Sequence, residues 1–195
     1  MINNPEAMLR FRKMLEAASP VTDKDLNDLV AVLHEKKFDK GEVILKEGQV
    51  CRYFYFILKG CIRSFGIEDG KEMNVNFFFE DEVACDFISF RMEKPSKVYL
   101  VAMEDCTVFY SAKTESAPLL DESDSLHKVL FRFFQQLYFK EEEHSNTFIL
   151  LSPEERYLYL LEKSPHYLQR IPLTHLASYL GMSRETLTRI RKKIS

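Results

Sequence analysis

Tryptophan is absent from this 195-residue chain, glycine occurs only six times, and no long apolar run is present. The longest apolar stretches, such as Tyr53 to Leu58 and Tyr99 to Met103, are too short for a helix that spans a bilayer. The N-terminus also lacks the basic stretch, long apolar run and small-residue cleavage site of a secretory signal peptide. We therefore expect a cytoplasmic protein without a membrane partner.

Cysteine and histidine are too few and too scattered to indicate a metal site. The four cysteines show no Cys-x-x-Cys spacing and stand at Cys51, Cys61, Cys85 and Cys106. A reducing compartment disfavours disulfides, so we expect buried thiols, with an iron–sulfur or zinc site through folding as the alternative. None of the five histidines lies between Phe38 and Ser111, which argues against a metal enzyme on a cupin-like β-roll. We expect no enzyme and no metal, and the cofactors are unknown.

Charge is unevenly distributed along the chain. The composition, 46% hydrophobic and 29% charged, is ordinary for a globular protein, and the length suits one large or two small domains. Residues 152–195 hold eight Lys and Arg against four Asp and Glu, a net charge of +4, whereas residues 1–151 hold nineteen against twenty-six, a net charge of −7. A basic segment on an acidic body favours a polyanionic partner for that segment.

The first 35 residues have the pattern of two helices. Pro5 suits the first turn of a helix that continues through apolar residues at helical spacing, namely Met8, Leu9, Phe11, Met14 and Leu15. Thr22 and Asp25 form the pattern of a capping box. The helix that they begin is expected to run through Leu26, Leu29, Val30 and Leu33.

From Phe38 to Ser111 the pattern changes to short aromatic and β-branched runs separated by turns. Five of the six glycines fall here, at Gly41, Gly48, Gly60, Gly66 and Gly70. Met73, Val75 and Phe77 alternate with Asn74 and Asn76, which is the period of a strand. Several short antiparallel strands at regular spacing predict a barrel or roll.

Residues 123–151 predict one long helix with a heptad-like apolar stripe. The stripe, which we call the predicted dimer seam, consists of Leu126, Leu130, Phe133, Leu137, His144 and Phe148 and ends near Leu151. Such a stripe favours a symmetric homodimer, and the alternative is that it packs only against its own β-roll. His144 is expected to be a core or interface histidine rather than a ligand.

A sharp helix start follows at Ser152. Ser152 can cap the helix, Pro153 suits its first position, and Glu155 completes a capping box. The helix runs through Tyr157, Leu160 and Leu161, and Pro165 and Pro172 mark a short link after it. We expect three parts: a β-roll sensor with its N-terminal helices (1–122), a dimerisation helix (123–151) and a DNA-binding domain (152–195).

The last 25 residues predict a helix-turn-helix. Leu173, Leu176, Ala177 and Leu180 recur at helical spacing, Gly181 interrupts them, and Ser183 can cap a second helix with Leu187, Ile190 and Ile194 on one side. In such a motif the second helix enters the major groove of DNA, where arginine can bind guanine and glutamate can accept from cytosine. The candidate DNA-binding residues are Ser183, Arg184, Glu185, Thr186, Thr188, Arg189, Arg191, Lys192 and Lys193.

These features predict a sequence-specific reader of double-stranded DNA. Two alternatives remain for the same residues. The helices could be a structural hairpin with a solvated basic face, or they could dock a protein partner as part of a ligand-binding or protein-interaction module.

The order of these parts resembles the Crp/Fnr family of bacterial transcription regulators. In the strand region the matching residues are Lys40, Gly41, Glu42, Ile44, Glu47 and Gly48, followed by Phe56, Ile57, Leu58, Gly60 and Arg63. Near the C-terminus they are Gly181, Ser183, Arg184, Glu185, Thr186, Arg189 and Ile190, which are similar to the recognition helix of the cyclic-AMP receptor protein group. The resemblance implies an α+β fold: a double-stranded β-roll of the cyclic-nucleotide-binding type, a long dimerisation helix and a C-terminal helix-turn-helix.

The resemblance also implies a mode of DNA binding. Arg184, Glu185 and Arg189 would face the bases of a half-site with a G-T-G-like core, and a homodimer would occupy a pseudo-palindromic site. RNA polymerase is a further candidate partner.

Two departures from the family pattern limit what it implies. Members that bind cyclic AMP hold its phosphate with a Gly-Glu-Leu helix start and an arginine, and the corresponding effector-pocket residues here are Cys85, Asp86, Phe87, Ser96 and Lys97. Without the guanidinium, and with acidic neighbours, cyclic AMP is not expected to be the effector. The sequence also stops after the recognition helix, at Ser195, without the β-hairpin wing of many relatives. In both respects the chain resembles members that are common in Bacteroidetes.

Overall fold

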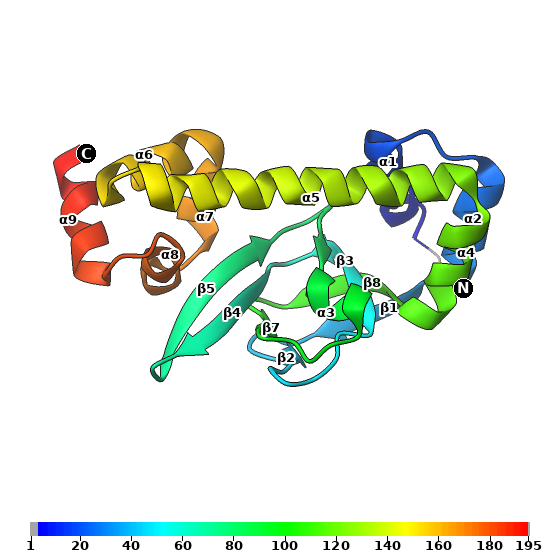
Figure 1. The fold of residues 1–195 in the computed structure, drawn as a ribbon, viewed down its shortest axis with the longest axis horizontal. Helices are drawn as coiled ribbons and strands as arrows, with labels where there is room; N and C mark the ends of the chain where they lie inside the picture. The colour runs from blue at the N-terminus through cyan, green and yellow to red at the C-terminus, as the bar shows by residue number, and fades with distance from the viewer. Residues whose placement is uncertain (1–3, 195) are drawn as a thin grey trace.

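The computed structural model describes residues 4–194. One long helix, α5 (Asp124–Leu150), runs along the whole molecule, with two β-sheets below its middle (Figure 1). Helices α1 (Pro5–Ala18), α2 (Asp23–Ala31) and α4 (Lys113–Glu122) gather at one end of α5. The other end carries α6 (Pro153–Lys163), α7 (Pro165–Arg170), α8 (Leu173–Tyr179) and α9 (Arg184–Ile194).

The strands form two antiparallel four-stranded sheets, in the orders β1-β8-β3-β6 (sheet A) and β2-β7-β4-β5 (sheet B). Their bounds are β1 His34–Phe38, β2 Val43–Leu45, β3 Tyr53–Lys59, β4 Ile62–Glu68, β5 Lys71–Phe78, β6 Val83–Ala84, β7 Tyr99–Ala102 and β8 Cys106–Ala112. A short helix, α3 (Phe87–Met92), follows β6. The predicted α+β class and the antiparallel roll are confirmed.

Three apolar clusters hold these parts together. The first fills the roll between the sheets and contains Ile57, Ile62, Leu100 and Val108, each with less than 1% of its surface exposed. The second lies outside sheet A, where Phe56, Leu58 and Phe109 pack against α1, α2 and α5. The third joins Cys61, Phe77 and Phe79 of the roll and its following loop to the C-terminal helices. The C-terminal helices therefore share a core with the roll.

Helix ends lie close to where the sequence places them because the caps are local. Asn4 accepts from the Ala7 N–H at the start of α1. The capping boxes Thr22 with Asp25 and Ser152 with Glu155 are both formed. Two corrections apply. Helix α2 ends at Ala31, so Leu33 is buried beyond it, because the last N–H groups bond three residues back and tighten the turn. The link after α6 is itself a helix, α7.

In β5 the two asparagines are buried and the apolar residues that directly precede them are exposed, which is the reverse of the usual pattern for a strand. Asn74 and Asn76 are buried at 7% exposure each, whereas Met73 and Val75 are 38% and 44% exposed. The Asn74 amide lies against α8, where its Nδ2 is 3.4 Å from the His175 carbonyl oxygen. The strand period is therefore correct, and Asn74 is inside because α8 covers it.

Candidate functional site

The turn between α8 and α9 is closed by a well-formed helix C-cap. Gly181 has a positive φ of 63°, its N–H donates to the Ser178 carbonyl, and the Met182 N–H donates to the Ala177 carbonyl over 3.0 Å. This pair of bonds is the Schellman motif, and the left-handed conformation that it needs favours glycine. A Cβ added at Gly181 would lie 2.6 Å from the Phe148 ring, so the position also lacks space for a side chain.

Ser183 then starts α9 as predicted. Its Oγ accepts from the Thr186 N–H over 3.2 Å and donates to the Thr186 hydroxyl. Glu185 stands in the first turn, where backbone N–H groups and Ser183 hold the pKa of its carboxyl below the usual range. The first turn of α9 is therefore fixed by its own residues and presents both charged and hydroxyl groups.

The two sides of α9 differ sharply. Leu187 and Ile190 are 0% and 7% exposed and pack into the third cluster. On the opposite side five side chains surround one shallow hollow, namely Arg184, Glu185, Thr188, Arg189 and Lys192. Figure 1 places α9 at the far end of the molecule, beyond the other C-terminal helices. Three cations and one carboxylate thus share one outward surface of α9.

The other predicted DNA-binding residues lie at the edge of this surface. Lys193 donates to both carboxylate oxygens of Glu154 on α6, at 2.8 and 2.9 Å. Arg191 is half-buried, and the Thr188 hydroxyl donates to the Arg184 carbonyl. The contact with Glu154 could not be expected from the sequence, because 39 residues separate the pair.

The predicted effector pocket is closed by its own hydrogen bonds. Asp86 caps α3, where its carboxylate accepts from the Ser89 N–H over 3.1 Å and from the Ser96 hydroxyl over 2.7 Å. An anionic ligand would need these same donors and would face the Asp86 charge. Cys85 is buried beside them, Lys97 is exposed, and Phe87 turns away toward α5. The structure therefore brings Asp86 and Ser96 together in an arrangement that disfavours a phosphate.

The predicted dimer seam is turned mainly toward its own chain. Leu126 is 1% exposed, Phe133 packs on Phe87 with ring centroids 5.1 Å apart, and His144 stacks on Tyr179 at 4.8 Å. Burial and Lys140 lower the pKa of His144. The outward side of α5 instead exposes large apolar side chains at 56–74%: Phe131, Tyr138, Phe139, Ile149 and Leu150.

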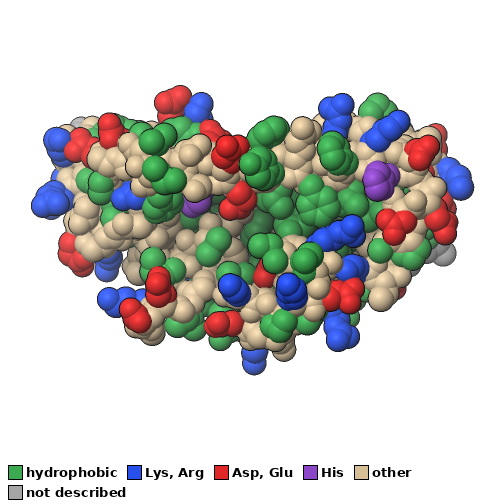
Figure 2. Space-filling model, viewed as in Figure 1, with side chains coloured by type: hydrophobic (Ala, Val, Ile, Leu, Met, Phe, Trp, Pro, Cys, Tyr) green, Lys and Arg blue, Asp and Glu red, His purple; other side chains and the backbone are tan. Residues whose placement is uncertain are grey.

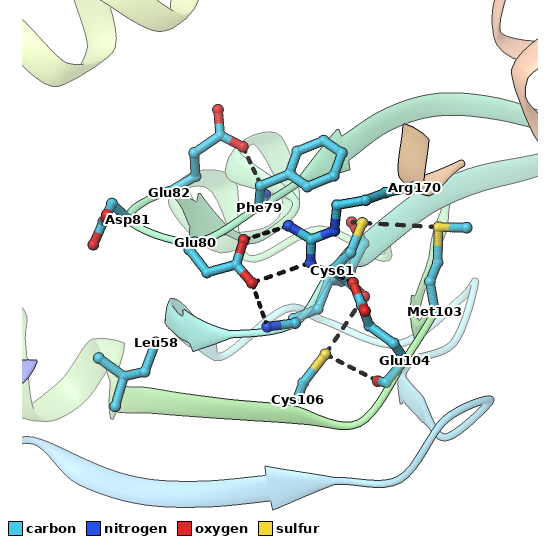
Figure 3. Close-up of polar contacts among 12 residues, drawn as sticks. Leu58, Cys61, Phe79, Glu80, Asp81, Glu82, Met103, Glu104, Cys106 and Arg170 are labelled. Atoms are coloured by element: carbon cyan, nitrogen blue, oxygen red, sulfur yellow. Dashed lines mark hydrogen bonds and ion pairs between the residues drawn. The ribbon is translucent and has the colours of Figure 1, made fainter. Parts of the chain in front are cut away.

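A polar cluster that the sequence analysis did not find links α7 to the roll (Figure 3). Arg170 donates to both oxygens of Glu80 and to Glu104, and its guanidinium lies 5.0 Å from the centre of the Phe79 ring. Glu80 also accepts from the Gly60 N–H over 2.8 Å. Burial by itself raises the pKa of Glu80, but the bonds from Arg170 and Gly60 outweigh it and lower the pKa to about 2.

The four cysteines are buried free thiols, as the sequence predicts. Burial raises the pKa of Cys106 to about 11 and raises that of Cys61 as well. Within residues 4–194 no group of three potential metal ligands comes together. In the same part of the chain, no helix combines the length and apolar character needed to cross a membrane.

Comparison with known proteins identifies the roll. Residues 35–123 match the family model of the cyclic nucleotide-binding domain. These residues have the cyclic nucleotide-binding fold. The comparison with curated protein sequences gave no significant match.

Solved structures are similar over most of the chain. FixK2 from Bradyrhizobium japonicum has a TM-score of 0.71 at 20% identity, covering 84% of this chain and 84% of that one. The c-di-GMP responsive global regulator CLP of Xanthomonas campestris has a TM-score of 0.68 at 19% identity, and the similarity covers 89% of this chain and 91% of that one. The catabolite activator protein of Thermus thermophilus has a TM-score of 0.59 at 20% identity, covering 93% of this chain and 86% of that one. A structural similarity to Crp/Fnr family regulators is thus confirmed, and at these identities it concerns the fold.

Proposed function

We propose that this chain is a sequence-specific DNA-binding transcription regulator of the Crp/Fnr type. The observation that carries the proposal is the outward side of α9, where Arg184 and Glu185 follow directly on the Ser183 cap and Arg189 shares their side of the helix. In a helix-turn-helix the N-terminal part of the second helix lies against base edges in the major groove. Helix α8 would then be the first helix of the motif, and α9 the recognition helix.

The three side chains have complementary chemistry for reading bases. Each arginine can donate two hydrogen bonds to guanine O6 and N7, and the Glu185 carboxylate can accept from the amino group of cytosine. We expect a half-site with a G-T-G-like core. Lys192 and Lys193 would serve the phosphate backbone, which sets affinity more than sequence preference.

A homodimer would present two such helices to a pseudo-palindromic site. Because the predicted dimer seam packs on its own chain, the dimer contact is proposed on the outward side of α5. Phe131 and Tyr138 are separated by seven residues, and Tyr138 and Ile149 by eleven, so the three share one stripe of the helix. Exposed aromatic and aliphatic side chains in a stripe favour a helix–helix interface.

Cyclic AMP is not the effector, since Asp86 occupies the donors that its phosphate would need. The division into a sensor (1–122), a dimerisation helix (123–151) and a DNA-binding part (152–195) is retained, and the chain is proposed to have no enzymatic activity. CLP is described as linking cell–cell signalling to virulence gene expression, and a comparable link between a signal and transcription is the role proposed here.

The decisive experiment is selection of bound duplexes from a randomised DNA library by the full-length chain. The expected result is enrichment of two related half-sites in inverted orientation, with centres about 34–36 Å apart or a multiple of that spacing. A chain that remains dimeric but retards no duplex at low salt would contradict DNA binding. That result would favour the alternative, in which the C-terminal helices dock a protein.

A further inference from the structure

A large apolar cavity lies between α5 and the roll. Its volume is about 520 Å³, and its walls come from α1, α3, α4, α5 and the segment around β6. Figure 2 shows the hollow below the middle of α5, with hydrophobic side chains on its floor. A volume of this size lies within the range of about 300–1,000 Å³ that small-molecule sites occupy.

Aromatic rings dominate the walls of this cavity. Seven phenylalanines line it: Phe11, Phe54, Phe78, Phe87, Phe90, Phe133 and Phe134. Phe87 of α3 lies 5.1 Å from Phe133 and 5.9 Å from Phe134 of α5, in tilted and edge-on geometry. Rings tilted in this way expose both edges and faces to the cavity. A further aromatic ring placed there can therefore form edge-to-face and offset-stacked contacts.

The charged groups among the lining residues neutralise each other. Arg10 pairs with Asp81 over 2.6 Å, and Arg10 also donates to the Leu58 carbonyl. Lys140 lies 3.6 Å from Glu82. Two cations and two carboxylates therefore leave no excess charge for a charged ligand, whose desolvation inside an apolar cavity would be unfavourable.

The cavity is separate from the predicted effector pocket. Of the five residues of that pocket, only Phe87 lines the cavity, while Asp86 and Ser96 bond to each other on the inner side of α3. Leu15, Leu29 and Val129, which line the cavity, belong to the apolar cluster outside sheet A. Phe78, which also lines the cavity, belongs to the cluster inside the roll, so a ligand in the cavity would touch the roll and α5 at once.

We infer that this cavity binds a neutral, ring-containing apolar molecule. Its phenylalanine walls supply contact area, its mutually paired charges select against ions, and its size admits a molecule of two or more rings. Filling it restores the dispersion contacts that an open apolar space lacks, so binding stabilises the folded chain. The inference concerns the sensor half of the molecule and stands independently of DNA binding.

The probe for a test is N-phenyl-1-naphthylamine, a neutral two-part aromatic fluorophore, titrated into the full-length chain. The expected result is a saturable rise in fluorescence with one probe per chain. A matched probe, 8-anilino-1-naphthalenesulfonate, adds a sulfonate to the same skeleton and is expected to bind roughly tenfold more weakly. Absence of saturable binding, or tighter binding of the sulfonate, would overturn the inference.

A lining residue and an exposed residue give a pair of variants. Leu130 of α5 lines the cavity, whereas Ile88 of α3 is 74% exposed and is not among the lining residues. Leu130→Trp is expected to fill the cavity and lower the affinity for the probe roughly tenfold, and Ile88→Trp is expected to leave this affinity unchanged. Equal affinity in both variants, or a loss only in Ile88→Trp, would place the probe elsewhere.

Two further measurements locate the bound probe more closely. Ala17 is an exposed lining residue, so Ala17→Trp narrows the entrance without disturbing the core if Leu130→Trp fails to fold. This variant is expected to lower the affinity for the probe as well. An unchanged affinity in a folded Ala17→Trp chain would contradict the site. Cyclic AMP is expected not to displace the probe, and competitive displacement would assign the probe to the nucleotide pocket instead.

Discussion

Arg170 and Glu80 are 90 residues apart in the chain and form a bidentate ion pair, in which Nη1 and Nη2 donate to the two carboxylate oxygens over 2.5 and 3.0 Å. Arg170 belongs to α7, and Glu80 follows β5. The pair therefore crosses the proposed boundary at residue 152 and, beside the third apolar cluster, attaches the C-terminal helices to the roll.

Replacing Arg170 by methionine should weaken this attachment while keeping an apolar side chain over Phe79. Both partners are 32% exposed, so solvent screening limits the loss in the free energy of unfolding to about 1 kcal/mol. Urea unfolding at low and high salt measures the effect, which should shrink as salt rises. A double-mutant cycle with Glu80→Gln gives the control, and additive effects would show that the pair is not coupled.

Acid should weaken the same attachment. The pKa of Glu80 in the fold is about 2, below the value of about 4.3 for an unpaired glutamate, so the unfolded chain binds the proton first. The stabilisation is complete above about pH 4.3 and is lost as the pH falls toward 2. Unfolding followed across this range should show a smaller acid sensitivity in Glu80→Gln than in the unmodified chain. Identical profiles would mean that Glu80 contributes nothing.

Arg189→Ala should impair base reading. Loss of a bidentate guanine contact is expected to cost about 1–3 kcal/mol on the selected site and to relax preference at one base pair. Binding to the selected duplex and to a scrambled duplex, at several salt concentrations, measures this. Equal loss on both duplexes would contradict a base-reading role for Arg189.

Lys193→Ala should instead weaken both duplexes alike and reduce the salt slope by about 0.9 for each phosphate that the ammonium neutralises. In the structure Lys193 is held by Glu154, so Glu154→Gln should release the ammonium and raise affinity for any duplex. Titrations of both duplexes over a range of salt concentrations measure the two slopes. A sequence-specific effect of either variant would assign Lys193 a different role.

Gly181→Ala should destabilise the C-terminal helices more than a glycine replacement at an open turn. Both Gly181 and Gly70 have positive φ, at 63° and 73°, so each replacement costs about 1–2 kcal/mol of backbone strain. At Gly181 the new Cβ also meets the Phe148 ring at 2.6 Å, whereas at Gly70 no atom of residues 4–194 lies within 4 Å of it. The unfolding temperatures of the two variants measure the difference: the shift at Gly70 reports backbone strain alone, and the larger shift expected at Gly181 adds the contact with Phe148. Equal shifts would mean that Phe148 moves aside without cost.

Ile149→Glu should dissociate the proposed dimer. Ile149 and Ile88 are each 74% exposed, and only Ile149 lies on the outward side of α5. A carboxylate at Ile149 would be buried against its own copy, while one at Ile88 would remain in water. Sedimentation of the unmodified chain should give a dimer, Ile149→Glu a monomer, and Ile88→Glu a dimer. Dissociation by both replacements, or by neither, would contradict the interface.

The features that the sequence predicted correctly are those that neighbouring residues determine. The cap at Ser183, the break at Gly181 and the capping box at Ser152 each involve residues within a few positions of one another. The strands of the roll follow from short apolar runs between turns, and the long helix follows from its spacing. Periodicity and caps therefore indicated the elements, their order and the exposed side of α9.

Contacts between distant segments could not be derived in this way. The sequence shows a stripe on α5 but not which surface covers it, and Phe87 and Tyr179, from two different parts of the chain, cover the predicted dimer seam. Asn74 has the sequence pattern of the outer side of a strand, and only the fold shows that the C-terminal helices cover it. Arg170, Glu80 and Glu104 carry no local signal at all, because an ion pair between a helix and two distant loops depends on the fold.

One hydroxyl group on α8 also protects the roll from self-association. β5 is an edge strand of sheet B, and Ser178 pairs two of its backbone groups by accepting from the Asn74 N–H and donating to the Glu72 carbonyl. Release of the C-terminal helices would leave these groups unpaired at a sheet edge that carries exposed Met73 and Val75. Such an edge is a template for strand addition and aggregation. As long as the C-terminal helices stay attached to the roll, α8 therefore covers this edge against strand addition.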